Sequence, residues 1–130
     1  MSEEQDNIEL VTRGYQAFAS GDMETVMALF DDNVEWVQPG NSTISGTYHG
    51  KGELGQYLAK LGEKSPTVTM NKLLADGDTV VALTEVAAAG EKARDAEVFT
   101  IRDGKTIRVV VHTDTAMMER VYGSKQHAAH

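Results

Sequence analysis

The chain has no cysteine among its 130 residues, and this absence narrows the chemistry open to it. Without cysteine there is no disulfide, no thiolate nucleophile and no zinc site built on cysteine ligands. Long hydrophobic runs are missing as well, since no apolar stretch approaches the roughly 20 residues that cross a bilayer. No membrane association is therefore expected. The first residues are acidic and polar, which predicts no signal peptide, and the cytoplasm is the expected compartment.

Positive charge is scarce, with 12 Lys and Arg against 20 Asp and Glu and a net charge of −8. Phosphate binding needs a basic face, so no nucleic-acid partner is expected. The chain also lacks a glycine-rich phosphate loop and a Gly-x-Ser-x-Gly nucleophile elbow. Its 41% hydrophobic and 25% charged residues are ordinary for a globular protein. We predict a single domain over residues 1–122, followed by a polar, fraying tail over residues 123–130.

The spacing of apolar residues predicts three helices and a sheet. Ser2 followed by Gln5 is typical of a capping box, and helical periodicity continues to residue 18. Shorter helices are expected over 23–30 and 51–61. Strands are expected over 34–37, 67–75, 79–89, 93–101 and 107–114, with a brief extended piece at 47–49 and a last helical turn over 115–121. This order predicts an α+β fold, with a curved, mixed, mostly antiparallel sheet wrapped around three helices to form a cone-shaped cavity.

The predicted strand over 107–114 carries an unusual polar pair at its end. His112 and Asp114 lie two positions apart, and side chains at i and i+2 leave a strand on the same face. Histidine is the usual general base near neutral pH, and Asp114 would orient it or act directly. The alternative is a pair on the outer or dimer-facing side of the sheet. A metal site would need a further ligand such as Glu97 or His49, and neither a metal nor a cofactor is expected.

Several short motifs occur in an order shared with a known superfamily. They are Tyr15-Gln16-Ala17-Phe18 with Gly21-Asp22, Leu29 to Trp36, Pro39-Gly40, Gly46 to Gly50, Arg102 to Lys105, and Asp114. Over residues 6–120 the chain resembles the nuclear transport factor 2-like superfamily, in particular its SnoaL-like and ketosteroid isomerase-like branch. The resemblance implies a homodimer that holds a small apolar ligand or substrate. This superfamily includes isomerases, cyclases, hydrolases, dehydratases and non-catalytic modules, so the fold does not decide the function.

The resemblance also implies roles for single residues. Tyr15 is near the isomerase tyrosine that donates to a developing oxyanion. Glu97 is near their acidic oxyanion-hole residue, and apolar neighbours would raise its pKa. Gln38 stands where the isomerases have a carboxylate base and cannot accept a proton, which argues against steroid isomerisation. Asp114 matches the acid/base aspartate of SnoaL-like cyclases. The expected ligand-binding residues are Trp36, Gln38, Tyr48 and Phe99, although aromatic residues at such places often only fill a core.

These observations favour cofactor-free acid/base catalysis of the isomerase or cyclase type on a small apolar carbonyl compound. His112 or Asp114 would move the proton, and Tyr15 or Glu97 would stabilise the enolate. The alternative from another class is a non-catalytic module that binds a small ligand or only dimerises.

Overall fold

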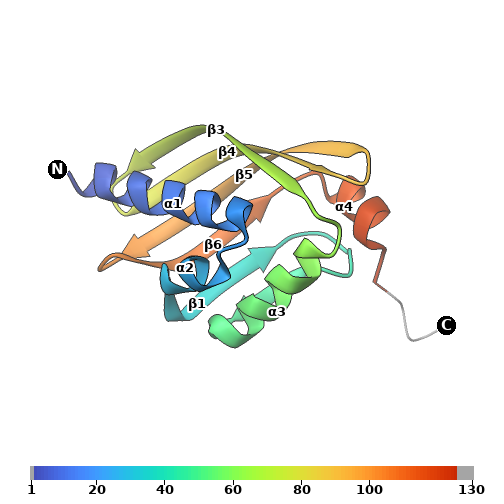
Figure 1. The fold of residues 1–130 in the computed structure, drawn as a ribbon, viewed down its shortest axis with the longest axis horizontal. Coiled ribbons are helices and arrows are strands. Elements are labelled where there is room, and N and C mark those ends of the chain that lie inside the picture. The colour runs from blue at the N-terminus through green and yellow to red at the C-terminus, as the bar shows by residue number, and fades with distance from the viewer. Residues whose placement is uncertain (1, 126–130) are drawn as a thin grey trace.

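The protein folds as four helices and a six-stranded sheet, described here from a computed structural model that covers residues 2–125. The elements in order are α1 (Glu3–Ser20), α2 (Met23–Ala28), β1 (Phe30–Gln38), β2 (Gly46–His49), α3 (Gly50–Gly62), β3 (Thr67–Asp76), β4 (Thr79–Ala88), β5 (Glu91–Arg102), β6 (Lys105–His112) and α4 (Thr115–Tyr122). This arrangement, drawn in Figure 1, confirms the predicted α+β fold. Within residues 2–125 we find no helix that is long and apolar enough to cross a membrane.

Both ends of helix α1 are set by residues that favour a helix start or a helix stop. The side chain of Ser2 accepts from the backbone of Gln5 at 3.1 Å, and the Gln5 side chain returns to the Ser2 backbone. This confirms the capping box, which satisfies two amide groups that the helix leaves free. The helix stops at Gly21, whose φ of 77° is left-handed and therefore suits glycine.

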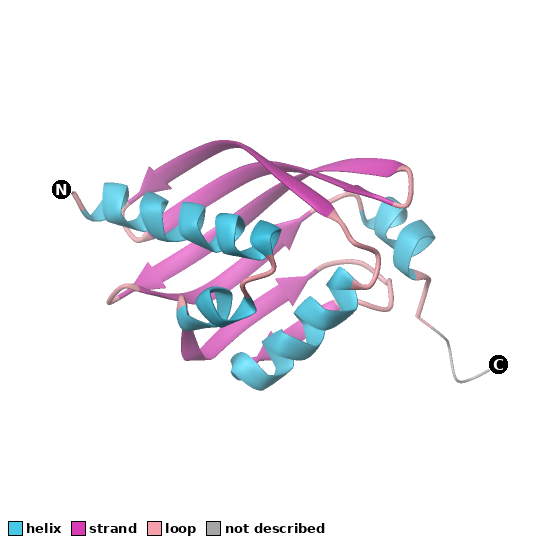
Figure 2. Cartoon of the chain, in the orientation of Figure 1, coloured by secondary structure: helices cyan, strands magenta, loops and turns pink. Residues whose placement is uncertain are grey.

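The sheet runs in the order β2-β1-β6-β5-β4-β3. β1 pairs with β6 in parallel and every other neighbouring pair is antiparallel, so the sheet is mixed as predicted. Bulges interrupt the pairing near Met70 and near Thr100, and bulges bend and twist a strand locally. In Figure 2 the helices α1, α2 and α3 all lie on one face of the sheet, while α4 sits at one end.

The core lies between the concave face of the sheet and the helices α1 and α3. Alternate residues of the strands point into it, which is the period of two that a half-buried strand requires. On β5, for example, Asp95 and Phe99 are buried, whereas Arg94 and Arg102 are exposed. Helix α1 packs on β3 and β4, and α3 packs on β1 and β2. The pocket described below opens inside this core.

Several boundaries differ from the prediction, and two of the differences have a clear physical cause. Phe30 was expected to close the second helix but begins β1, because its ring packs against Trp36 at 6.1 Å and its backbone pairs with Thr106. The predicted tail is held at its start, since the amide of Lys125 donates to Asn41 at 2.9 Å and Ser124 forms a bridge with Ser42. The rest of that tail lies outside the described residues.

Candidate functional site

A cavity lies between the concave face of the sheet and the helices that cover it. The cavity has a volume of about 80 Å³. This is well below the roughly 300–1,000 Å³ of a usual small-molecule pocket, so the cavity admits only a compact group. Its lining is Leu10, Val11, Gly14, Tyr15, Phe18, Val26, Leu29, Phe30, Trp36, Leu58, Leu61, Val68, Glu97, Phe99 and Thr106. All but a few of these side chains are apolar.

Two of the lining residues form a hydrogen-bonded pair. Tyr15 comes from the inner face of α1, and Glu97 comes from the inner face of β5 across the cavity, 82 positions later. The hydroxyl of Tyr15 donates to Oε1 of Glu97, and the Tyr15 ring meets Phe99 edge-on at 6.0 Å. Glu97 and Phe99 share a face because they are two residues apart on one strand. The cavity therefore contains one polar pair in an apolar wall.

Burial sets the protonation of this pair. The pKa of Glu97 is raised to about 7, mainly by desolvation and also by the charge of Asp95, while the hydrogen bond from Tyr15 lowers it. The pKa of Tyr15 is raised, first by burial and then by the neighbouring Glu97 charge. Tyr15 therefore stays protonated and acts as a donor. Glu97 is divided between acid and carboxylate near neutral pH, which is the condition that favours general acid and base catalysis alike.

The aromatic wall of the cavity comes from β1 and β5. Trp36 is 7% exposed and lines the cavity together with Phe99. Its ring also packs against Tyr57 of α3 at 5.2 Å. Within residues 2–125, the indole Nε1 of Trp36 is buried without a hydrogen-bond partner of normal geometry. Since buried donors are nearly always paired, this indole is a candidate donor to a ligand.

Gln38 and Tyr48, the other two expected ligand-binding residues, do not line the cavity. Gln38 is 4% exposed and accepts from the hydroxyl of Tyr57 at 2.7 Å. Tyr48 lies opposite Trp36 on the neighbouring strand, its ring packs against Tyr57 at 4.9 Å, and its hydroxyl donates to the carbonyl of Ile44. Gln38 and Tyr48 both contact Tyr57, whose ring packs against Trp36.

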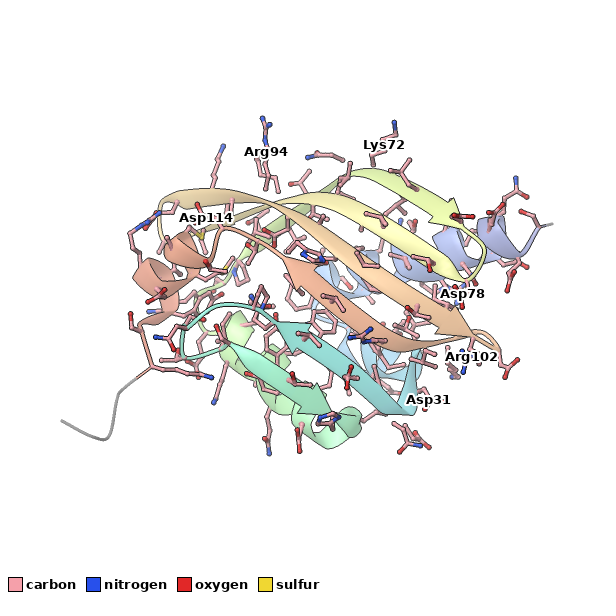
Figure 3. All side chains as sticks on the ribbon, turned by 180° about the vertical axis from the view of Figure 1, so that it is seen from behind. Asp31, Lys72, Asp78, Arg94, Arg102 and Asp114 are labelled. Atoms are coloured by element: carbon pink, nitrogen blue, oxygen red, sulfur yellow. The ribbon has the colours of Figure 1, made fainter. Side chains whose placement is uncertain are left out.

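The prediction that His112 and Asp114 share a face of one strand is wrong. Val111 pairs directly with Glu97, so Val111 faces the cavity and its neighbour His112 faces the opposite side, where it is exposed. β6 ends at His112, and Asp114 instead caps α4 by accepting from the amide of Met117 at 3.0 Å. Figure 3 labels Asp114 next to helix α4. Neither residue lines the cavity.

A second inward carboxyl, on Asp95, was missed by the sequence analysis. Asp95 is 6% exposed, lies two residues before Glu97 on the inner face of β5, and accepts from the hydroxyl of Thr113 at 2.5 Å. Burial raises its pKa, and the bond from Thr113 opposes that rise. Asp95 is outside the cavity lining, but its charge raises the pKa of both Tyr15 and Glu97. The spacing of two residues from Glu97 was the signal that could have found it.

A cone-shaped cavity in an α+β fold, with one acid and one phenol in an apolar wall, defines a class of small-molecule pocket. The model of the SnoaL-like domain family matches residues 11–109, and the chain therefore belongs to that family. Its fold is that of the nuclear transport factor 2-like proteins, which confirms the predicted superfamily.

Individual relatives share the architecture along most of their length. The uncharacterized protein Rv0034 of Mycobacterium tuberculosis is 29% identical over 111 residues, covering 79% of this chain and 85% of that protein. The structure of Bal32a, from a soil-derived mobile gene cassette, is 28% identical with a TM-score of 0.87 and covers 93% of this chain and 99% of that one. TerC, co-crystallized with polyporic acid, is 25% identical with a TM-score of 0.79, at 92% and 99% coverage.

Proposed function

We propose that this protein binds a small apolar carbonyl compound in the cavity and moves a proton on it, with Glu97 as the acid and base and Tyr15 as the hydrogen-bond donor. The observation that carries the proposal is the Tyr15–Glu97 pair in an otherwise apolar wall, with the pKa of Glu97 raised to about 7. A carboxyl with such a pKa is available in both forms at neutral pH, so it can take a proton and return it. TerC, a relative co-crystallized with polyporic acid, supports a small organic ligand.

The chemistry requires no cofactor. The carboxylate of Glu97 takes a proton from the carbon beside the carbonyl, and the electrons of that C–H bond form the double bond of an enolate. Once Glu97 is neutral, the hydroxyl of Tyr15 gains more by donating to the enolate oxygen, which now carries the charge. Glu97 then returns its proton to carbon, at the same or a neighbouring position. The raised pKa of Tyr15 keeps its proton in place throughout.

Exchange of hydrogen for deuterium at a ketone tests this step without knowledge of the natural substrate. With 4-methylcyclohexanone in heavy water, NMR should show wild-type protein accelerating exchange beside the carbonyl. The rate should rise as Glu97 ionises and reach half its maximum near the pKa of about 7. Glu97→Gln should reduce exchange to the rate in buffer, while the exposed Glu9→Gln should not. Equal exchange rates in wild type and Glu97→Gln would refute the mechanism.

A purely ligand-binding role is the second candidate. It is favoured by the position of Gln38, which is buried against Tyr57 and leaves Glu97 as the one carboxyl in the described cavity lining. In this case ketones, or polyporic acid, would change the fluorescence of Trp36 without any exchange of hydrogen. Trp36 is the only tryptophan of the chain, so its fluorescence reports on the cavity wall alone.

We also propose that the protein is a homodimer that packs through the outer face of the sheet. A row of apolar residues crosses five paired strands on that face: Leu74, Val81, Val98, Val110 and Val37. Leu74 is 46% exposed, and in Figure 3 this face carries none of the described helices. Uncovered apolar patches of this kind commonly mark interfaces. Sedimentation should show a dimer that Val98→Glu dissociates, whereas Lys60→Glu on the exposed side of α3 does not, and a monomeric wild type would contradict the proposal.

A further inference from the structure

A second hollow, which we call the vestibule, lies beside the cavity between α2 and α3. Met23 and Met27 form one wall, and Gly55, Ala59 and Gly62 form the other. Its volume is about 470 Å³. The vestibule is therefore much roomier than the inner cavity.

Two residues line both the vestibule and the cavity. Phe18 at the end of α1 and Leu58 in the middle of α3 line both hollows. A ligand whose polar end lies at Glu97 and which extends past these two side chains would enter the vestibule. The two hollows are thus neighbours that meet at the side chains of Phe18 and Leu58.

The chemistry of the walls selects what the vestibule can hold. Its described lining contains no charged side chain, and Ser65 is its one hydroxyl. Methionine side chains are flexible and polarizable, so they adapt to apolar groups of different shape. On the opposite wall the glycines leave open space, since a Cβ at Gly55 would meet nothing within 4 Å. An apolar chain would therefore find room and no unsatisfied polar partner.

We propose that the vestibule binds the apolar tail of an elongated ligand whose carbonyl head lies at Tyr15 and Glu97. The inner cavity admits only a compact head, and the vestibule supplies the room for a tail several carbons long. The proposal rests on the proposed function for the position of the head. It names the substrate class more closely, as a carbonyl compound with an extended hydrocarbon substituent.

Filling the vestibule from Gly55 tests the proposal. Gly55 and Gly52 both lie in α3, and a Cβ at either position would meet nothing within 4 Å. Only Gly55 lines the vestibule, so Gly55→Leu occupies it while Gly52→Leu is the matched control. Both changes remove a helical glycine, so neither should weaken the helix. Binding of 4-methylcyclohexanone and 4-pentylcyclohexanone is then measured by calorimetry for each protein.

We expect only Gly55→Leu to lose the preference for the pentyl ketone over the methyl ketone. A buried methylene tightens binding about fourfold, so the four added carbons should give wild type and Gly52→Leu a preference on the order of a hundredfold for the pentyl ketone. In Gly55→Leu this preference should fall below about tenfold, because the leucine occupies the space that the tail needs. An unchanged preference in Gly55→Leu would overturn the tail site while leaving the head site intact.

Methionine methyl signals give an independent reading of where the tail lies. With ¹³C-labelled methionine, the pentyl ketone should shift the methyl signals of Met23 and Met27, and the methyl ketone should not. Met117 and Met118 in α4 serve as internal controls. If neither vestibule methionine responds to a bound pentyl ketone, the tail proposal is wrong.

If neither ketone binds wild type at all, the proposed function and the tail site are both wrong. A change in oligomeric state in Gly55→Leu, with the preference kept, would assign the vestibule to a protein contact and overturn the proposal.

Discussion

Glu97→Gln should change how the stability of this protein depends on pH. The substitution keeps the size of the side chain and an oxygen that can accept from the hydroxyl of Tyr15, but it removes the titrating proton. Glu97 lies in an apolar wall, where desolvation raises its pKa from an ordinary 4.5 to about 7. The folded wild-type protein therefore carries an acid whose ionisation its own surroundings oppose.

The sign of the effect follows from proton release on unfolding. Between pH 4.5 and about 7 the folded protein holds the Glu97 proton, whereas the unfolded chain has lost it. Raising the pH therefore favours the unfolded state, so the contribution of Glu97 is largest at low pH and declines up to pH 7. At about 1.4 kcal/mol per pH unit, the folded wild-type protein should lose about 3 kcal/mol of stability between pH 5 and 8 through this group. Glu97→Gln should lose none of it.

Urea denaturation followed by the fluorescence of Trp36 measures this difference directly. The free energy of unfolding is determined for both proteins at several values of pH, and the difference between them removes the contributions of the other titrating groups. Relative to wild type, Glu97→Gln should gain stability steadily as the pH rises, and the gain should level off above about 7. The exposed Glu9→Gln is the control. Parallel curves for wild type and Glu97→Gln would show that the pKa of Glu97 is not raised.

Further predictions concern the neighbours of Glu97 and the two residues outside the cavity. Asp95→Asn removes a charge that raises the pKa of Glu97, and Tyr15→Phe removes a hydrogen bond that lowers it. The midpoint of deuterium exchange should therefore move to lower pH in Asp95→Asn and to higher pH in Tyr15→Phe, and a shift in the same direction would contradict the assignment. His112→Ala should leave exchange unchanged, because the imidazole is on the far side of the sheet. Asp114→Ala should cost about 1 kcal/mol of stability through loss of the α4 cap without slowing exchange, and a slower reaction at constant stability would restore its proposed catalytic role.

The elements with strong local signals could be predicted from the sequence. The capping box at Ser2 and the break between the predicted strands over 67–75 and 79–89 each depend on a few residues, and both stand where the sequence placed them. Phe30 shows the limit of this reasoning. It continues the helical spacing from Val26, but its contacts with Trp36 and Thr106 draw it into β1. Tertiary contacts decide such a boundary, and periodicity alone does not contain them.

The face of β6 was the main error in predicting the site. Val109, Val110 and Val111 are consecutive valines, so the run itself does not show which side is buried. The polar residues of the same strand contain the answer, since Arg108 and His112 share a parity and both are exposed. Because Arg108 is basic, burial of the face that it shares with His112 would be unfavourable. The parity that His112 shares with Arg108 is therefore the sequence signal that places the imidazole on the outer face.

Glu97 was placed near the cavity by resemblance, but its properties depend on contacts that no single motif describes. Tyr15 lies 82 positions away on α1, and Asp95 acts on Glu97 because both face inward on β5. With His112 and Asp114 outside and Gln38 bonded to Tyr57, Glu97 is the one carboxyl in the described cavity lining. A single group must then both remove and return the proton, and this is efficient only when its pKa lies near the working pH. The apolar wall around Glu97 therefore does more than hold a ligand, since burial by that wall is the first cause of a pKa of about 7.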